Sequence, residues 1–153
     1  MNIKLFVMDV DGTLTDGKIY MGSAGEMMKA FHVKDGYGIH NILPQLGVIP
    51  VILTGRKSEI VKERSRELGV VNVIQGSEDK VEDLRALLRQ MSMDWNQVAY
   101  IGDDLNDLSV MRKVAWAACP CDAVDEIKEI CQYVSTKEGG FGAVRDAIDH
   151  LPN

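Results

Sequence analysis

The feature that most constrains the fold is an alternation of short apolar runs with longer amphipathic segments. Each run is continuous and rich in Val, Ile or Leu, which is typical of strands buried on both faces. The expected strands are residues 3–8, 48–53, 71–74, 98–101, 115–118 and 133–134. The expected helices between them are residues 37–46, 58–68, 80–91, 105–113, 123–131 and 143–150. This alternation predicts an α/β fold, a Rossmann-like parallel sheet with helices on both faces.

One segment, residues 18–31, interrupts the alternation. Residues 19–21 and 27–31 look like two strands joined by the stretch 22–25, which predicts a β-hairpin projecting after the first strand. Because an isolated hairpin is marginal in water, we expect its apolar side chains to pack on another surface, for which a second subunit is a candidate. These side chains are Met21, Met27, Met28 and Phe31. The whole chain, residues 1–153, is expected to form a single domain.

Polar residues follow four of the expected strands, at the sheet edge where open α/β folds bind ligands. Gly12 permits a turn that lets the two acidic residues of the first strand face one pocket. Two anionic groups there need a hard cation, and an oxygen shell with few carboxylates suits Mg²⁺. The residues are Asp9 and Asp11 after the first strand, Thr54 after the second, Lys80 beyond the third, and Asp103, Asp104 and Asp107 after the fourth.

This set of residues predicts phosphoryl transfer. The Asp9 carboxylate can attack phosphorus when a metal offsets the repulsion between the two anions. Thr54 can donate a hydrogen bond to the transferred group, and Lys80 adds positive charge where transition-state charge spreads. Asp11 can protonate the leaving alkoxide and then deprotonate the water that hydrolyses the acyl phosphate.

The other acidic residues have two interpretations. Asp104 fits an N-cap and Asp107 a first-turn acid of the following helix. Both also fit a supporting role beside the metal, and the sequence favours neither.

These clusters resemble the haloacid dehalogenase-like phosphatase superfamily motif by motif. The resemblance implies that Asp9 is the nucleophile, Asp11 the general acid/base, and that Thr54 and Lys80 hold the phosphoryl group. It also implies that magnesium binds the Asp9 side chain, the Asp11 backbone carbonyl and Asp103. The matching motifs are D-x-D-G-T at 9–13, a strand ending at Thr54, the lysine Lys80, and G-D-D-x-x-D at 102–107.

Three further stretches resemble a narrower group, the 3-deoxy-D-manno-octulosonate 8-phosphate phosphatases. They lie at residues 16–21, 31–39 and 139–145. Those enzymes have no cap domain, and no domain-sized insert separates the motifs of this chain. They are usually tetramers whose hairpins form a central barrel, so the resemblance implies a homotetramer assembled through the hairpin.

The same resemblance implies a sugar-acid phosphate as substrate. Arg56 and Arg64 match two arginines that contact the sugar acid, and an arginine fork can bond both oxygens of a carboxylate. The alternative is that both are surface helix residues paired with nearby glutamates. Residues 32–36 are expected to form a loop that reaches the substrate across a subunit boundary. The expected substrate contacts are His32, Val33, Lys34, Asp35, Gly36, His40, Gly55, Arg56 and Arg64.

Three other functions stay open. A nonulosonate 9-phosphate phosphatase would use the same chemistry, although Arg56 favours the eight-carbon acid because some nine-carbon enzymes have an acidic residue there. A phospho-acceptor signalling domain also combines acidic residues with Thr, Lys and Mg²⁺, but its acceptor lies apart from its acidic pair. A non-catalytic oligomerisation domain fits less well, because the full set of catalytic residues is present.

The net charge and hydropathy of the chain limit the classes of partner that it is expected to bind. A net charge of −6 argues against binding to nucleic acid or to an anionic membrane. No apolar run approaches the ~20 residues that span a bilayer, and residues 1–8 are too short for a signal peptide. We therefore expect a cytoplasmic enzyme without a nucleic-acid or membrane partner.

Overall fold

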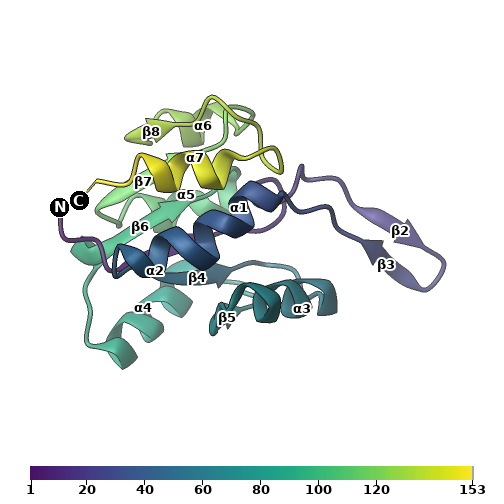
Figure 1. Cartoon of the computed structure of the whole chain (residues 1–153), viewed down its shortest axis with the longest axis horizontal. Coiled ribbons are helices and arrows are strands. Elements are labelled where there is room, and N and C mark those ends of the chain that lie inside the picture. The colour runs from purple at the N-terminus through teal and green to yellow at the C-terminus, as the bar shows by residue number, and fades with distance from the viewer. Residues whose placement is uncertain (153) are drawn as a thin grey trace.

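The computed structural model describes residues 1–152. One sheet of six parallel strands has the order β5-β4-β1-β6-β7-β8. Figure 1 shows helices on both sides of this sheet, which confirms the predicted Rossmann-like architecture. The strands are β1 (Leu5–Met8), β4 (Ile49–Leu53), β5 (Asn72–Ile74), β6 (Val98–Ile101), β7 (Trp116–Cys119) and β8 (Tyr133–Val134).

The central strand β1 contributes to two separate cores. Side chains alternate across a strand, so Phe6 and Met8 join one apolar cluster while Leu5 and Val7 join the other. All four are fully buried, which explains why this strand is apolar at every position rather than at every second one.

The helices divide between the two faces of the sheet. The first cluster includes residues of α3, α7 and η1, and the second includes residues of α4, α5 and α6. Among the described residues, no helix has both the length and the apolar composition needed to cross a membrane. The helices are α1 (Val33–Tyr37), the π-helix η1 (Gly38–Ile42), α2 (Leu43–Gln45), α3 (Glu59–Leu68), α4 (Lys80–Met91), the 3-10 helix η2 (Trp95–Gln97), α5 (Leu105–Met111), α6 (Asp125–Lys128) and α7 (Ala143–Asp149).

The first helical segment begins four residues earlier than predicted. His32 caps α1 by accepting the Lys34 N–H at Nδ1 (3.2 Å), so the prediction of a loop over residues 32–36 was wrong. Glycine is a poor helix former, and Gly36 and Gly38 therefore read as a loop signal. In the fold they serve close packing instead: a Cβ on Gly36 would lie 2.6 Å from the guanidinium of Arg64.

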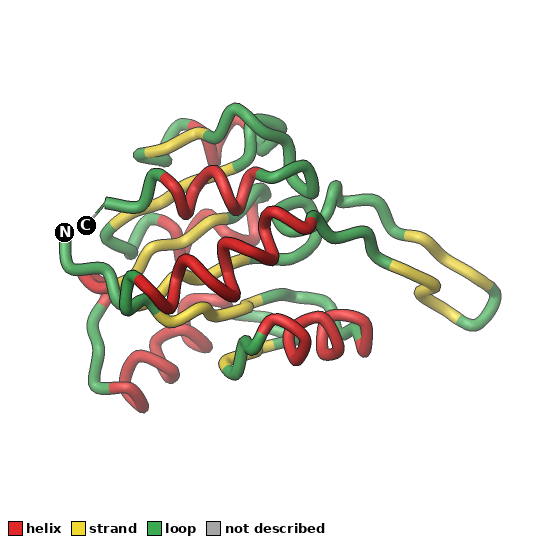
Figure 2. Tube along the Cα trace, in the orientation of Figure 1, coloured by secondary structure: helices red, strands yellow, loops and turns green. Residues whose placement is uncertain are grey.

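The predicted hairpin is present. Strands β2 (Tyr20–Gly22) and β3 (Gly25–Met28) pair antiparallel, and the turn between them is two residues long instead of the four expected. Figure 2 shows the hairpin extending away from the body of sheet and helices. Met21, Met27 and Met28 are exposed, whereas Phe31 packs against the first core cluster and so finds its partner within the chain.

Candidate active site

The carboxyl ends of β1, β4 and β6 meet at one edge of the sheet. Met8 at the end of β1 lies opposite Ile52 of β4 and Ile101 of β6, so the residues that follow these strands become neighbours. A cleft of about 270 Å³ opens there. It is lined by Asp9, Asp11, Thr54, Gly55, Arg56, Asp104, Leu105 and Asn106.

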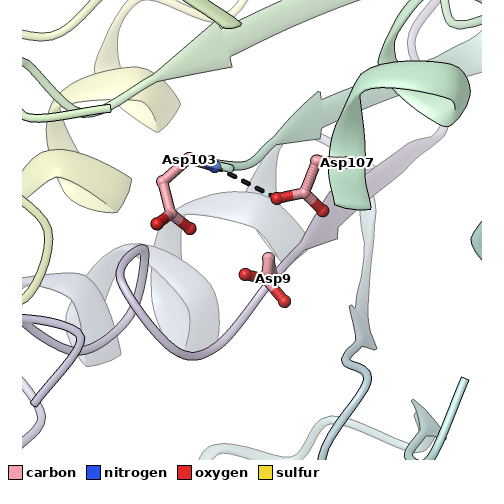
Figure 3. Close-up of side chains that lie close together, drawn as sticks. All are labelled: Asp9, Asp103 and Asp107. Atoms are coloured by element: carbon pink, nitrogen blue, oxygen red, sulfur yellow. Dashed lines mark hydrogen bonds between the residues drawn. The ribbon is translucent and has the colours of Figure 1, made fainter. Parts of the chain in front are cut away.

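Three carboxylates gather at this edge (Figure 3). Asp9, Asp103 and Asp107 each offer one oxygen, and these oxygens lie within 4.8 Å of one another. Asp9 follows β1, Asp103 follows β6, and Asp107 lies in the first turn of α5. The Asp103 N–H donates to Asp107 Oδ2 at 3.1 Å, which fixes the two residues of the β6–α5 connection relative to each other. Such a set of hard oxygen donors fits Mg²⁺.

Assembling these carboxylates is electrostatically unfavourable without a cation. Burial, followed by the charge of Asp107, raises the pKa of Asp9 to about 6. Burial and the charge of Asp9 raise the pKa of Asp103 to about 8. A bound divalent cation reverses both effects because it favours the ionised form of each ligand.

Lys80 provides a permanent positive charge beside this group. It is the first residue of α4, and its Nζ donates to Asp9 Oδ1 at 2.9 Å and to Asp107 Oδ1 at 2.7 Å. Burial opposes its charged form, but the two carboxylates outweigh that effect and raise the pKa of Lys80. The lysine therefore stays charged next to the predicted nucleophile, as the sequence had suggested.

Asp107 has a larger structural role than expected. It is fully buried and accepts hydrogen bonds from Lys80, from the Tyr100 hydroxyl (2.7 Å) and from the Asp103 amide. It also completes a capping box with Asp104 at the start of α5, which confirms the cap interpretation of Asp104. Tyr100 was not identified from the sequence, because it lies within an apolar run. It could have been noticed because the hydroxyl of a buried tyrosine needs a hydrogen-bond partner.

The turn after β1 is shaped around Asp103. The Thr13 hydroxyl donates to Asp103 Oδ1 at 2.8 Å, and Gly12 adopts φ +92°. A Cβ on Gly12 would collide with the Asp103 carboxylate. The glycine thus supplies both the backbone conformation and the space for the Asp103 side chain.

Asp11 lines the same cleft as Asp9, as predicted, but its carboxylate lies outside the group of three. Its Oδ1 lies 2.5 Å from the Nζ of Lys29, and its Oδ2 lies 3.9 Å from the Nε of Arg56. Lys29 comes from the base of the hairpin and was not identified from the sequence, where an isolated lysine reads as a solvated surface residue. The Asp11 backbone carbonyl as a metal ligand stays a prediction.

The predicted substrate contacts do not all lie in the catalytic cleft. Gly55 and Arg56 line the catalytic cleft, and the Arg56 side chain is about half exposed. Three other predicted contacts lie outside this cleft. Val33 and Lys34 are exposed on α1, and the ring of His40 is hydrogen-bonded to the Leu68 carbonyl (2.9 Å).

A second hollow contains the other expected contacts and shares no lining residue with the cleft. His32, Asp35, Gly36 and Arg64 all line it. The Arg64 guanidinium lies over the Phe31 ring at 5.6 Å. It also pairs with Glu67, which agrees with the alternative interpretation that this arginine pairs with a nearby glutamate. Roles for these residues in substrate binding stay predictions.

A family model described as haloacid dehalogenase-like hydrolase matches residues 53–148. The chain belongs to the haloacid dehalogenase-like hydrolase family. Its relatives include the 3-deoxy-D-manno-octulosonate 8-phosphate phosphatases KdsC of Salmonella typhi and of Escherichia coli K12. Each is 43% identical over 150 residues, which cover 98% of this chain and 79% of the relative.

Solved structures agree with this membership. The phosphatase of the same name from Moraxella catarrhalis, in complex with magnesium, phosphate and a KDO molecule, is 42% identical with a TM-score of 0.93, over 97% of this chain and 85% of that one. The cobalt-bound deoxy-D-mannose-octulosonate 8-phosphate phosphatase of Haemophilus influenzae is 36% identical with a TM-score of 0.93, over 97% and 86%.

The comparisons confirm the predicted family and the phosphatase class, and they favour both over the signalling and oligomerisation alternatives. They also agree with the predicted Mg²⁺ cofactor, because a relative holds magnesium and this chain has the donor set to bind it.

Proposed function

We propose that this phosphatase hydrolyses 3-deoxy-D-manno-octulosonate 8-phosphate through a phospho-aspartate formed on Asp9. The observation that carries the proposal is the position of Asp9, buried beside Lys80 and Asp103 yet lining an open cleft. The substrate is taken from relatives 43% identical over nearly the whole chain.

Asp9, the Asp11 backbone carbonyl and Asp103 would hold Mg²⁺. Asp107 would support them, because its oxygens accept hydrogen bonds from Lys80, Tyr100 and the Asp103 amide. The ion supplies positive charge that lets an anionic carboxylate approach an anionic phosphate. Lys80 adds a second positive charge from the start of α4, and Thr54 lines the cleft directly after β4. These groups are set before substrate arrives, so little reorganisation accompanies the attack of Asp9 on phosphorus.

Asp11 is the proposed general acid and general base. As the bond between phosphorus and the ester oxygen breaks, the Asp11 carboxyl gives its proton to that oxygen, while Asp9 forms its bond to phosphorus. Asp11 then takes a proton from the water that attacks the phospho-aspartate, which returns Asp9 as a carboxylate and releases phosphate. Its place in the cleft but outside the group of three carboxylates suits this role.

Arg56 is the proposed contact for the sugar acid. It lines the cleft together with Thr54, and among residues 1–152 its guanidinium is held by two long ion pairs, 3.9 Å to Asp11 and 3.7 Å to Glu26. A loosely held, half-exposed arginine can turn to a substrate at little cost.

The test is a steady-state screen of the purified chain with Mg²⁺ against a panel of sugar and sugar-acid phosphates. We expect the highest kcat/KM for the eight-carbon ester. A higher kcat/KM for a nonulosonate 9-phosphate would transfer the assignment to that substrate.

The covalent step has its own test. Substrate labelled with ³²P, quenched in acid during turnover, should leave label on the peptide that contains Asp9. Label that never appears there, in an enzyme that turns over, would refute the phospho-aspartate.

A homotetramer built through the hairpin, and a cytoplasmic location, complete the proposal. The exposed methionines of the hairpin support the assembly, since three large apolar side chains on a two-stranded ribbon favour burial against a partner.

A further inference from the structure

Lys29 is a buried lysine at the base of the hairpin. Its side chain is only 2% exposed, and its Nζ lies 2.5 Å from Asp11 Oδ1 and 3.0 Å from Glu26 Oε2. Burying an ammonium group is costly unless its charge is paired, and here two carboxylates pair it. The lysine is therefore fixed in place by the same contact that fixes Asp11.

The second partner, Glu26, is itself held. Its Oε1 accepts a hydrogen bond from the Ser58 hydroxyl at 2.5 Å, and Ser58 caps α3. The chain of contacts from Ser58 through Glu26 to Lys29 anchors the ammonium to the body of the protein. A rigid anchor of this kind limits the rotamers of the side chain that it contacts.

The two oxygens of Asp11 have different surroundings. Oδ1 lies 2.5 Å from the Lys29 Nζ, whereas Oδ2 lies 3.9 Å from the Nε of the half-exposed Arg56. Among residues 1–152 the hydrogen bond to this carboxylate is made at Oδ1, which leaves Oδ2 available to carry a proton to or from a ligand in the cleft.

We propose that Lys29 is a positioning residue that holds Asp11 by Oδ1 and so directs Oδ2 toward the ester oxygen of the substrate. This rests on the proposed function, in which Asp11 protonates the leaving group. The hairpin stem then contributes directly to catalysis, because its lysine sets the geometry of the proton transfer. A purely structural salt bridge would instead stabilise the hairpin without favouring one chemical step.

Leaving groups of different basicity separate these two roles. An alkyl ester leaves as a strongly basic alkoxide and needs the acid, whereas p-nitrophenolate leaves without one. The parameter to compare is kcat/KM, which reports only the steps up to departure of the leaving group and excludes hydrolysis of the phospho-aspartate.

The experiment uses the full chain with Mg²⁺, and compares 3-deoxy-D-manno-octulosonate 8-phosphate with p-nitrophenyl phosphate. We expect Lys29→Met to lower kcat/KM for the sugar ester by roughly 10-fold or more and for the aryl ester by less than about 3-fold. Asp11→Asn should show the same selectivity, and Lys29→Met should add little to it in the double variant. Lys29→Arg, which keeps the charge, should recover part of the loss.

Lys62→Met is the matched control, since the side chain of that lysine is 70% exposed and pairs with Glu59 on the surface of α3. We expect wild-type values for both esters. Thermal melting shows which variants are folded, and Lys29→Gln replaces Lys29→Met if the latter does not fold. Equal losses on the two esters, or full additivity with Asp11→Asn, would overturn the role of Lys29. A wild-type chain that hydrolyses neither ester would contradict the proposed function itself, and the role of Lys29 would fall with it.

Discussion

At the residue scale, the catalytic turn owes its shape to glycines from both ends of the sequence. A Cβ on Gly139 would collide with the Gly12 carbonyl, and one on Gly140 would lie 2.5 Å from the Asp16 nitrogen. The Gly140 N–H also donates to the Thr13 carbonyl at 3.2 Å. The segment from 139 onward matched the phosphatase motifs by resemblance alone; the fold supplies the physical reason, a backbone-to-backbone contact behind the nucleophile.

Gly139→Ala should therefore displace the turn that carries Asp9 and Asp11. We expect a loss of stability of about 1–3 kcal/mol, as for other overpacked sites, together with a lower kcat. Urea unfolding and steady-state kinetics measure the two effects. The exposed neighbour Glu138, changed to Ala, is the control and should leave both unchanged. An unaltered kcat in Gly139→Ala would show that the turn tolerates the shift.

The metal ligands make a second prediction at this scale. Mg²⁺ should raise the thermal midpoint of the wild type, because a ligand that binds only the folded state stabilises it. Asp103→Asn should remove most of that increase, whereas Asp125→Asn, at a side chain 92% exposed on α6, should retain it. A full Mg²⁺-dependent increase in Asp103→Asn would exclude Asp103 as a ligand.

The sequence was sufficient to identify those site residues that differ from the residues around them in the chain. Asp9 ends an apolar run, and a charge there is costly unless it is used. Lys29 and Tyr100 were missed for the opposite reason: each is ordinary in its local segment and gains meaning only from a partner brought close by the fold, Asp11 for the lysine and Asp107 for the tyrosine.

At the scale of elements, helix α1 is joined to helix α7 by a buried carboxylate. Asp35 Oδ1 accepts the backbone N–H of Arg145 at 2.8 Å, while Oδ2 finds no hydrogen-bond partner within residues 1–152. Burial raises the pKa of Asp35 from 3.8 to about 6, against the lowering effects of that hydrogen bond and of the charges on His32, Arg64 and Arg145.

This shift predicts a pH dependence of stability. A raised pKa means that the folded state holds the proton more tightly, so the stabilisation is present below the unfolded pKa and is lost as pH rises through the folded one. Relative to Asp35→Asn, which cannot titrate, the wild type should lose about 2 kcal/mol between about pH 4.5 and pH 8. Urea unfolding of both proteins at several pH values measures the difference, and a constant difference would show that Asp35 stays ionised.

Element types were predictable where periodicity was strong, and boundaries were not. The strand cores were found because buried parallel strands are apolar throughout. The start of α1 was missed because Gly36 and Gly38 are chosen for close packing against α3 and α7, a demand that local propensity does not reveal.

At the scale of the whole molecule, the hairpin carries three large apolar side chains that residues 1–152 leave exposed. Met21, Met27 and Met28 are 62%, 67% and 51% exposed. Burying them in an assembly would contribute roughly 25 cal/mol for each Å² of apolar surface removed from water.

Met27→Lys combined with Met21→Lys should consequently convert the proposed tetramer to a monomer, as measured by light scattering at micromolar concentration. The control is Val71→Lys, at a side chain 89% exposed on the body of the molecule, which should remain a tetramer. A wild-type chain that is already monomeric would exclude the assembly.

The contacts of Lys80 have a consequence for how the protein acquires its ion. Once a bound cation favours the ionised form of all three carboxylates, they and the one ammonium carry two net negative charges, which a single Mg²⁺ balances. The Lys80 ammonium belongs to the chain and offsets part of the carboxylate charge even when no metal is bound. We therefore expect the chain to fold without metal and to bind the ion reversibly afterwards. A monovalent ion would leave one negative charge on this group, which would repel the incoming phosphate, so the charge balance favours a divalent ion.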